Sequence, residues 1–261
     1  MIRATLALPV MIAAFWDAWR LLGSRFGDNL SAVPLALILV AVAWPALRRR
    51  PDGASPHVPA ALPCAMMALY VAAAVAGPAL AQIVVAVVAI LVTAHKASAG
   101  RLPPAPLVVL GLLALPVLPS FDFYLAYPMR MLCAALTAGL LRLNGLAVGV
   151  DGVALSWHGS LILFDAACSG VRMLWAALFL VSAIALAAGF GVRRYAGGLA
   201  VAVALTIVGN ALRAASLFYV ENGFVDRLSG PVAHEAVGIV SFLLLGLLTA
   251  VAVSPRHWRL V

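Results

Sequence analysis

Long apolar stretches separated by short polar segments make up most of the chain. A helix needs about 20 residues to cross the hydrocarbon core of a bilayer, and stretches of roughly that length predict about eight spanning helices. They are residues 4–22, 31–47, 58–77, 78–94, 104–119, 169–190, 195–218 and 235–253. The first stretch lacks the small-residue cleavage region of a signal peptide, so we interpret it as a retained anchor. The pattern predicts an all-α polytopic membrane protein, with residues 1–261 forming one integral-membrane domain.

Basic residues predict the orientation of these helices. Arginine and lysine concentrate in the cytoplasmic loops of multi-pass membrane proteins. Here they cluster in alternate connections and after the last span, at Arg48, Arg49, Arg50, Lys96, Arg101, Arg193, Arg194, Arg256 and Arg259. We therefore expect a protein of the cell (inner) membrane with both termini in the cytoplasm. Residues 120–168 and 219–234 are then extracytoplasmic.

Two segments of this outer part are predicted not to cross the membrane. A ninth span at residues 127–148 would move the later basic connections to the outside. The polar residues Arg130, Thr137 and Asn144 are spaced by seven, which favours a helix in the outer headgroup layer. Residues 150–164 have turn residues between short, partly alternating arms, and this predicts a small β-hairpin that leads into the sixth span.

Composition agrees with a membrane protein and excludes other classes. The chain is 65% hydrophobic and only 10% charged, far from a soluble globular domain. Its net charge of +8 lies in short clusters between apolar stretches, so it does not indicate nucleic-acid binding. The three cysteines, Cys64, Cys133 and Cys168, lack the paired spacing of a zinc site or a disulfide framework. We expect no metal and no cofactor.

Three polar residues are expected at the outer ends of three different helices. Cys168 precedes the sixth span, His234 precedes the eighth, and Arg213 lies about 27 Å along the seventh at 1.5 Å per residue. Each has an ordinary explanation alone, as a packing thiol, a snorkelling arginine or a helix cap. Their shared depth favours a site, because ionisable groups in a membrane are costly unless paired or used. A helix N-terminus would also lower the pKa of Cys168.

The motifs occur in a recognisable order: Cys168-Ser169-Gly170 at a helix head, Asn210 and Arg213 as N-x-x-R on the next helix, then His234 and Gly238. This arrangement resembles the exosortase/archaeosortase family of membrane transpeptidases. The resemblance covers about residues 121–242, and the earlier helices only as a general plan. Because the chain ends soon after the eighth span, we expect it to lack the extra C-terminal domain of some relatives.

The resemblance implies a cysteine transpeptidase acting on C-terminal sorting signals. Such substrates are membrane-anchored exported proteins with a Pro-Glu-Pro-like motif, a transmembrane helix and a basic tail. They would pass through a thioester to a glycan or lipid acceptor at the cell surface. The implied catalytic residues are Cys168 as nucleophile, Arg213 as stabiliser of the thiolate and oxyanion, and His234 as acid–base. Substrate-binding or orienting roles are expected for Asn210, Asp165, Ser169 and Glu235. Besides these substrates the expected partner is the lipid bilayer, with no nucleic acid.

Three other functions remain open from the sequence. A small-anion transporter would use Arg213 to bind its substrate, although transporter sites usually lie near the bilayer midplane. A noncatalytic component of polysaccharide export or assembly is compatible with the composition, and for it Cys168→Ala would be silent. An intramembrane protease would differ from a transpeptidase only in using water as the acceptor.

Overall fold

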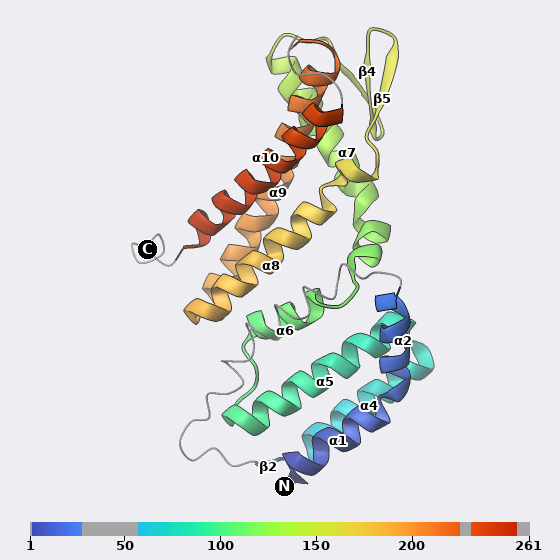
Figure 1. Ribbon diagram of the computed structural model, residues 1–261, viewed down its shortest axis with the longest axis vertical. Helices are drawn as coiled ribbons and strands as arrows, with labels where there is room; N and C mark the ends of the chain where they lie inside the picture. Colours follow the sequence, from blue (N-terminus) through green and yellow to red (C-terminus); the bar gives the residue numbers. More distant parts are fainter. Residues whose placement is uncertain (1, 28–56, 225–230, 255–261) are drawn as a thin grey trace. The chain divides into compact units, whose positions relative to one another are not determined.

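The structure, a computed structural model, describes residues 2–27, 57–224 and 231–254 (Figure 1). These residues are mostly helical and include two small antiparallel sheets. The chain divides into two compact units, Met1–Val117 and Leu118–Val261. The predicted span at residues 31–47 lies outside the described residues.

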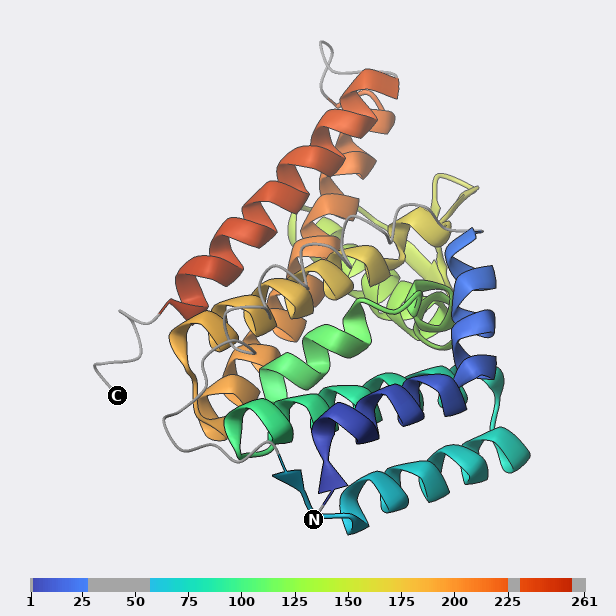
Figure 2. The same ribbon diagram turned by 60° about the horizontal axis from the view of Figure 1, so that its bottom comes forward.

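The first unit is built around one long helix, α5. Its elements are β1 (Ile2–Arg3), α1 (Ala4–Ala14), α2 (Trp16–Gly27), β2 (His57–Val58), α4 (Ala61–Ala76), α5 (Ala79–Ala99) and α6 (Ala105–Leu113). Helices α1, α2, α4 and α6 all contact α5, and α1, α4 and α5 lie side by side in Figures 1 and 2. The core between them contains Met11, Phe15 and Tyr70, and the rings of Phe15 and Tyr70 are 4.4 Å apart.

In this unit α5 matches the predicted span at residues 78–94, and α4 matches the one at residues 58–77 but has only 16 residues, too few to count among the candidate spans. The stretch at residues 4–22 forms two helices, α1 and α2, that meet at an angle of 58°. The stretch at residues 104–119 contains only α6, which has 9 residues. At 1.5 Å per residue α6 is about 14 Å long, under half the thickness of a bilayer core. Pro116 follows shortly after α6, and proline opposes helix continuation because it lacks an N–H.

The second unit is a helical bundle with a small sheet at one end. Its elements are α7 (Leu118–Leu143), β3 (Gly149–Asp151), β4 (Ala154–Trp157), β5 (Ser160–Leu163), the 3₁₀ turn η1 (Ala166–Ser169), α8 (Val171–Ala188), α9 (Val192–Glu221) and α10 (Pro231–Val253). Helices α8, α9 and α10 contact one another, and α7 contacts α8 and α9. Figure 1 shows β4 and β5 near the end of the bundle where α9 stops and α10 starts.

The sheet confirms the predicted hairpin and extends it by one strand. The strand order is β3-β4-β5, all antiparallel, with Leu155 opposite Val150 on one side and Ile162 on the other. His158 and Gly159 form the tip between β4 and β5, with φ angles of 49° and 81°. Positive φ at both positions is typical of the two-residue turns that match the twist of a hairpin. His158 is exposed there.

A shared core joins the sheet to α7 and α9. It contains Leu155 and Phe164 from the sheet region, Cys133 and Ala138 from α7, and Phe218 from α9, together with smaller neighbours. The Trp157 ring packs edge-on against Phe218 at 5.1 Å. Alanines on α7 and α9 let the two helices approach closely. Phe164, in the segment that leads from β5 into η1, is buried in this core, so the core fixes that segment.

Helix α7 differs from the predicted interfacial helix in its length. It begins at Leu118 rather than at residue 127, and its 26 residues are long and apolar enough to cross a membrane. Its second half packs beside the second half of α9, where Thr137 donates to the carbonyl of Ala211 at 3.3 Å. Among the described residues five helices meet the requirement for a span, namely α5, α7, α8, α9 and α10, and the bent pair α1 and α2 makes a sixth if it counts as one.

Candidate active site

Cys168 lies in η1, the single turn between the sheet and α8. Asp165 precedes this turn, and its Oδ1 accepts a hydrogen bond from the backbone N–H of Cys168 at 3.0 Å. Gly170 ends the turn with a φ of 74°, and α8 begins at the next residue. Cys168 therefore lies before α8 rather than in its first turn, and its own N–H is already bonded to a carboxylate.

Asn210 of α9 holds this turn in place. Its Nδ2 donates to the carbonyl of Cys168 at 2.7 Å and approaches Sγ of Cys133 at 3.3 Å. A Cβ at Gly170 would lie 2.9 Å from the Asn210 side chain, so only glycine permits this approach. The side chain of Asn210 is 3% exposed. The sequence suggested that Asn210 orients Arg213 or binds substrate, whereas here it positions the backbone of Cys168.

The contact with Asn210 also sets the level of Cys168 along α9. From Val192 to Asn210, α9 measures about 27 Å, close to the thickness of a bilayer core of about 30 Å. Residues 211–221 continue past this level for about 16 Å more at 1.5 Å per residue. This extension packs against the second half of α7 and against the sheet. Cys168 therefore lies near one boundary of the layer that α8 and α9 can span.

Cys168 and His234 line one cavity of about 160 Å³ beside the sheet. We call it the sheet cavity. Its walls come from β4, β5, η1, α9 and the start of α10, and two carboxylates, Asp165 and Glu221, also line it. Residues that the sequence placed on two separate helix ends are thus brought to a common space.

His234 has a carboxylate partner that the sequence did not reveal. Its Nδ1 lies 2.8 Å from Oε1 of Glu221, the last residue of α9. With Nδ1–H donating to this carboxylate, the other ring nitrogen, Nε2, is available as a base. Glu235, for which a substrate-binding or orienting role was expected, is exposed on α10. The only sequence signal for Glu221 was an acid at the end of the helix preceding His234.

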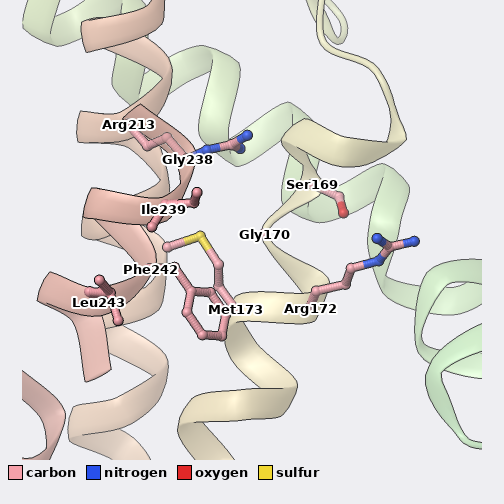
Figure 3. A pocket seen from close by; sticks show the side chains of 9 residues that line it. All are labelled: Ser169, Gly170, Arg172, Met173, Arg213, Gly238, Ile239, Phe242 and Leu243. Atoms are coloured by element: carbon pink, nitrogen blue, oxygen red, sulfur yellow. The ribbon is translucent and has the colours of Figure 1, made fainter. Parts of the chain in front are cut away.

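Arg213 and Ser169 line a second cavity, of about 380 Å³, which lies between the start of α8 and the first half of α10. We call it the bundle cavity. Figure 3 shows the guanidinium of Arg213 pointing toward the turn that carries Ser169. On α10 the guanidinium passes Gly238, where a Cβ would lie 3.8 Å from its nitrogens. The hydroxyl of Ser169 is buried and accepts the N–H of Val171 at 3.3 Å.

The electrostatic surroundings favour a neutral thiol at Cys168. Burial, and then the carboxylate of Asp165, raise the pKa of Cys168 to about 11, while the charge of Arg213 acts in the opposite direction. From a position at a helix N-terminus we expected a lowered pKa for Cys168. The pKa is raised instead, because Cys168 is partly buried in a separate turn that is capped by Asp165. A thiol of this kind needs a nearby base before it can act as a nucleophile.

The site thus offers a thiol, an imidazole held by a carboxylate, and a guanidinium within one end of the bundle. Within residues 2–27, 57–224 and 231–254, no group of three or more His, Cys, Asp and Glu side chains is placed to hold a metal ion. These groups are the ones that nucleophilic acyl transfer requires: a nucleophile, its base and a donor for developing negative charge.

Comparison with known proteins gives one match. Residues 5–251 match a family model described as "Transmembrane exosortase". No curated protein and no solved structure matches the chain.

Proposed function

Because the chain belongs to the transmembrane exosortase family, whose members are cysteine transpeptidases, we propose that it cleaves the C-terminal sorting signals of exported membrane-anchored proteins through a thioester on Cys168. The observation that carries this proposal is the cavity shared by Cys168 and His234. It supplies a thiol and a base to the same small space, at the boundary of the bundle.

The first step is attack on the scissile peptide bond. His234, held through Nδ1 by Glu221, takes the thiol proton on Nε2 while Sγ of Cys168 bonds to the carbonyl carbon. The carbonyl oxygen becomes an oxyanion and needs a fixed donor. The N–H of Cys168 already bonds Asp165, so this donor has to come from elsewhere. Arg213 is permanently charged and presents several N–H groups.

The second step releases the membrane helix of the substrate. The tetrahedral intermediate collapses, the C–N bond breaks, and His234 returns its proton to the leaving amine. The exported protein is then joined to Cys168 as a thioester. An amine or hydroxyl of a surface glycan or lipid attacks this thioester and gives its proton to His234, the C–S bond breaks, and the departing sulfur takes the proton back from His234 as the free thiol. If water attacks instead, the result is hydrolysis.

We place this site on the extracytoplasmic side, with both termini of the chain in the cytoplasm. The support is the positive charge of the opposite end of the bundle. Arg193 and Arg194 lie there at the start of α9, whereas Arg172 and Arg213 at the site end are accompanied by the acids Asp165 and Glu221. Arg194 donates to the carbonyl of Ser254 at 3.4 Å, so the start of α9 and the end of α10 lie together at this basic end. Basic ends face the cytoplasm in most multi-pass proteins.

The test is processing of a tagged protein with a Pro-Glu-Pro-type signal, a membrane helix and a basic tail. Coexpression with the wild-type enzyme should shorten the tagged protein. Coexpression with Cys168→Ala should leave the tagged protein at full length, although the variant enzyme accumulates to the normal level. Cys64→Ala is the matched control, because Cys64 is an exposed thiol of α4, and it should process as the wild type does. Processing retained by Cys168→Ala would overturn the proposal and favour a noncatalytic assembly component.

A further inference from the structure

We propose that the substrate lies across the site with its membrane helix in the bundle cavity and its exported side in the sheet cavity. This inference rests on the proposed function and deepens it, because it assigns a place to each side of the scissile bond. Two cavities flank the segment that carries Cys168, one lined by Cys168 and His234 and the other by Arg213 and Ser169. A chain that occupies both passes the turn that carries Cys168 and Ser169.

The two cavities lie at different depths along α10. His234 of the sheet cavity is at the beginning of α10, whereas Gly238 and Leu243 of the bundle cavity lie further along it. At 1.5 Å per residue the difference is about 6–14 Å toward the middle of the helix. The start of α8 gives the same order of depth. Met173 of the bundle cavity lies in the first turn of α8, whereas Cys168 of the sheet cavity lies in η1 before this helix. The bundle cavity is therefore the deeper one.

The walls of the bundle cavity suit an occupant that lies within the bilayer. Apart from Arg213, Arg172 and Ser169 they are glycines and the apolar side chains of Met173, Ile239, Phe242 and Leu243. Ile239 is 60% exposed and Leu243 is 64% exposed, so the cavity is open on the face that α10 presents to lipid. A substrate part that enters from this side must itself be apolar and membrane-embedded. For a membrane-anchored substrate that part is its transmembrane helix.

The sheet cavity suits the other side of the scissile bond. Asp165 and Glu221 line it, and burying a charged carboxylate against an apolar helix is costly. Its other walls, which include Leu163, are largely apolar, and the carboxylates and the imidazole of His234 are its polar groups. These groups offer hydrogen-bond partners to the backbone of an extended chain, which a membrane helix cannot use because its backbone is already bonded. The reverse orientation would bring the substrate helix against two carboxylates.

The guanidinium of Arg213 reaches toward the passage between the two cavities. Gly170 and Gly238 line the bundle cavity, and the place of a Cβ is taken by Asn210 at Gly170 and lies against Arg213 at Gly238. The guanidinium points toward the turn that carries Ser169 (Figure 3), where a substrate carbonyl can accept hydrogen bonds from its N–H groups. The carbonyl that crosses here is the one that Cys168 attacks. The first turn of the substrate helix then contacts Phe242.

The direct test is site-specific photo-crosslinking in full-length Cys168→Ala enzyme coexpressed with the tagged substrate. A photoreactive phenylalanine analogue at Ile239 should capture substrate residues on the C-terminal side of the cleavage position. The same group at Leu163 should capture residues on the N-terminal side, and both are mapped by mass spectrometry. Val251, an exposed residue near the other end of α10, is the matched control and should not capture residues next to the cleavage position.

The outcomes separate this inference from the proposed function, which is tested by processing in the wild type. Exchange of the two capture patterns, or capture of lipid alone at Ile239 while the wild type processes the substrate, would overturn the orientation. A size exchange provides the second measurement. Phe242→Trp should reduce processing about tenfold for a substrate with a bulky first helical turn, and alanine in that turn of the substrate should restore it. Equal loss with both substrates would contradict the assigned contact.

Discussion

The charge of Asp165 should hold Cys168 in its unreactive form, and Asp165→Asn tests this directly. Asparagine keeps an oxygen that can accept the N–H of Cys168, now at 3.0 Å, so η1 should persist while the negative charge is lost. The pKa of Cys168 is raised from 9.0 to about 11 by burial first and by Asp165 second. Removing the carboxylate should therefore lower this pKa, and removing Arg213, whose charge lowers it, should raise it further.

The size of the effect follows from the thiolate fraction. A pKa of about 11 leaves roughly 10⁻⁴ of the thiol ionised at pH 7, against roughly 10⁻² for a pKa of 9. A thiolate with a lower pKa is also a weaker nucleophile, which offsets about half of this gain on a logarithmic scale. A full return to the ordinary value would thus accelerate alkylation about tenfold at neutral pH. Because burial remains, we expect an increase of about threefold to fivefold for Asp165→Asn, and a decrease for Arg213→Ala.

The assay is iodoacetamide labelling in isolated membranes, quantified by mass spectrometry for the peptide that contains Cys168. Exposed Cys64 is the internal reference, and its labelling rate should not change between variants. In the wild type the rate should rise with pH up to about 11, because the raised pKa keeps the thiol protonated below that value. In Asp165→Asn the rise should level off at a lower pH. Slower or unchanged labelling of Cys168 in Asp165→Asn, with Cys64 constant, would refute the reasoning.

Three further predictions concern the groups around the thiol. Glu221→Ala should lower the turnover of substrate more than Glu235→Ala does, and Glu221→Gln should recover part of it, because only Glu221 bonds the imidazole of His234; equal kinetic losses at the two glutamates would contradict this. Asn210→Ala should reduce the free energy of unfolding by about 1–3 kcal/mol in detergent, since it leaves a carbonyl of η1 without its donor. Gly170→Ala should abolish processing at normal protein levels, because a Cβ there meets Asn210 at 2.9 Å; wild-type processing would show that the turn tolerates displacement.

Hydropathy predicted α8, α9 and α10 to within a few residues. The stretch at residues 169–190 became Val171–Ala188, and glycines at both of its ends explain the sharp limits. The hydropathy pattern did not predict helix limits that depend on tertiary packing. The break at Phe15 between α1 and α2 has no proline or glycine to announce it. Phe15 is fully buried against Tyr70 and its neighbours, and such a contact between distant residues cannot be read from local periodicity.

The candidate site shows the same division. The shared level of Cys168 and His234 followed from their positions directly before the sixth and eighth apolar stretches, which begin on the same side of the predicted bundle. The partner of His234 did not, because Glu221 is thirteen residues away and the two meet only when α9 and α10 pair. The pKa of Cys168 was expected in the wrong direction for a related reason. Its sign depends on burial and on the separate turn capped by Asp165, and neither is encoded in the spacing of the motif.

The extension of α9 past Asn210 has a consequence for the choice of lipid. Because about 27 Å of α9 separates Val192 from the level of Cys168, this distance nearly equals the thickness of an average hydrocarbon core, so the position of the thiol should respond to hydrophobic mismatch. For the thioester proposed on Cys168, we expect lipids with longer acyl chains to draw it below the headgroups, where water is scarce, and shorter chains to lift it into water. The proposed mechanism then predicts that a thicker membrane favours transfer over hydrolysis.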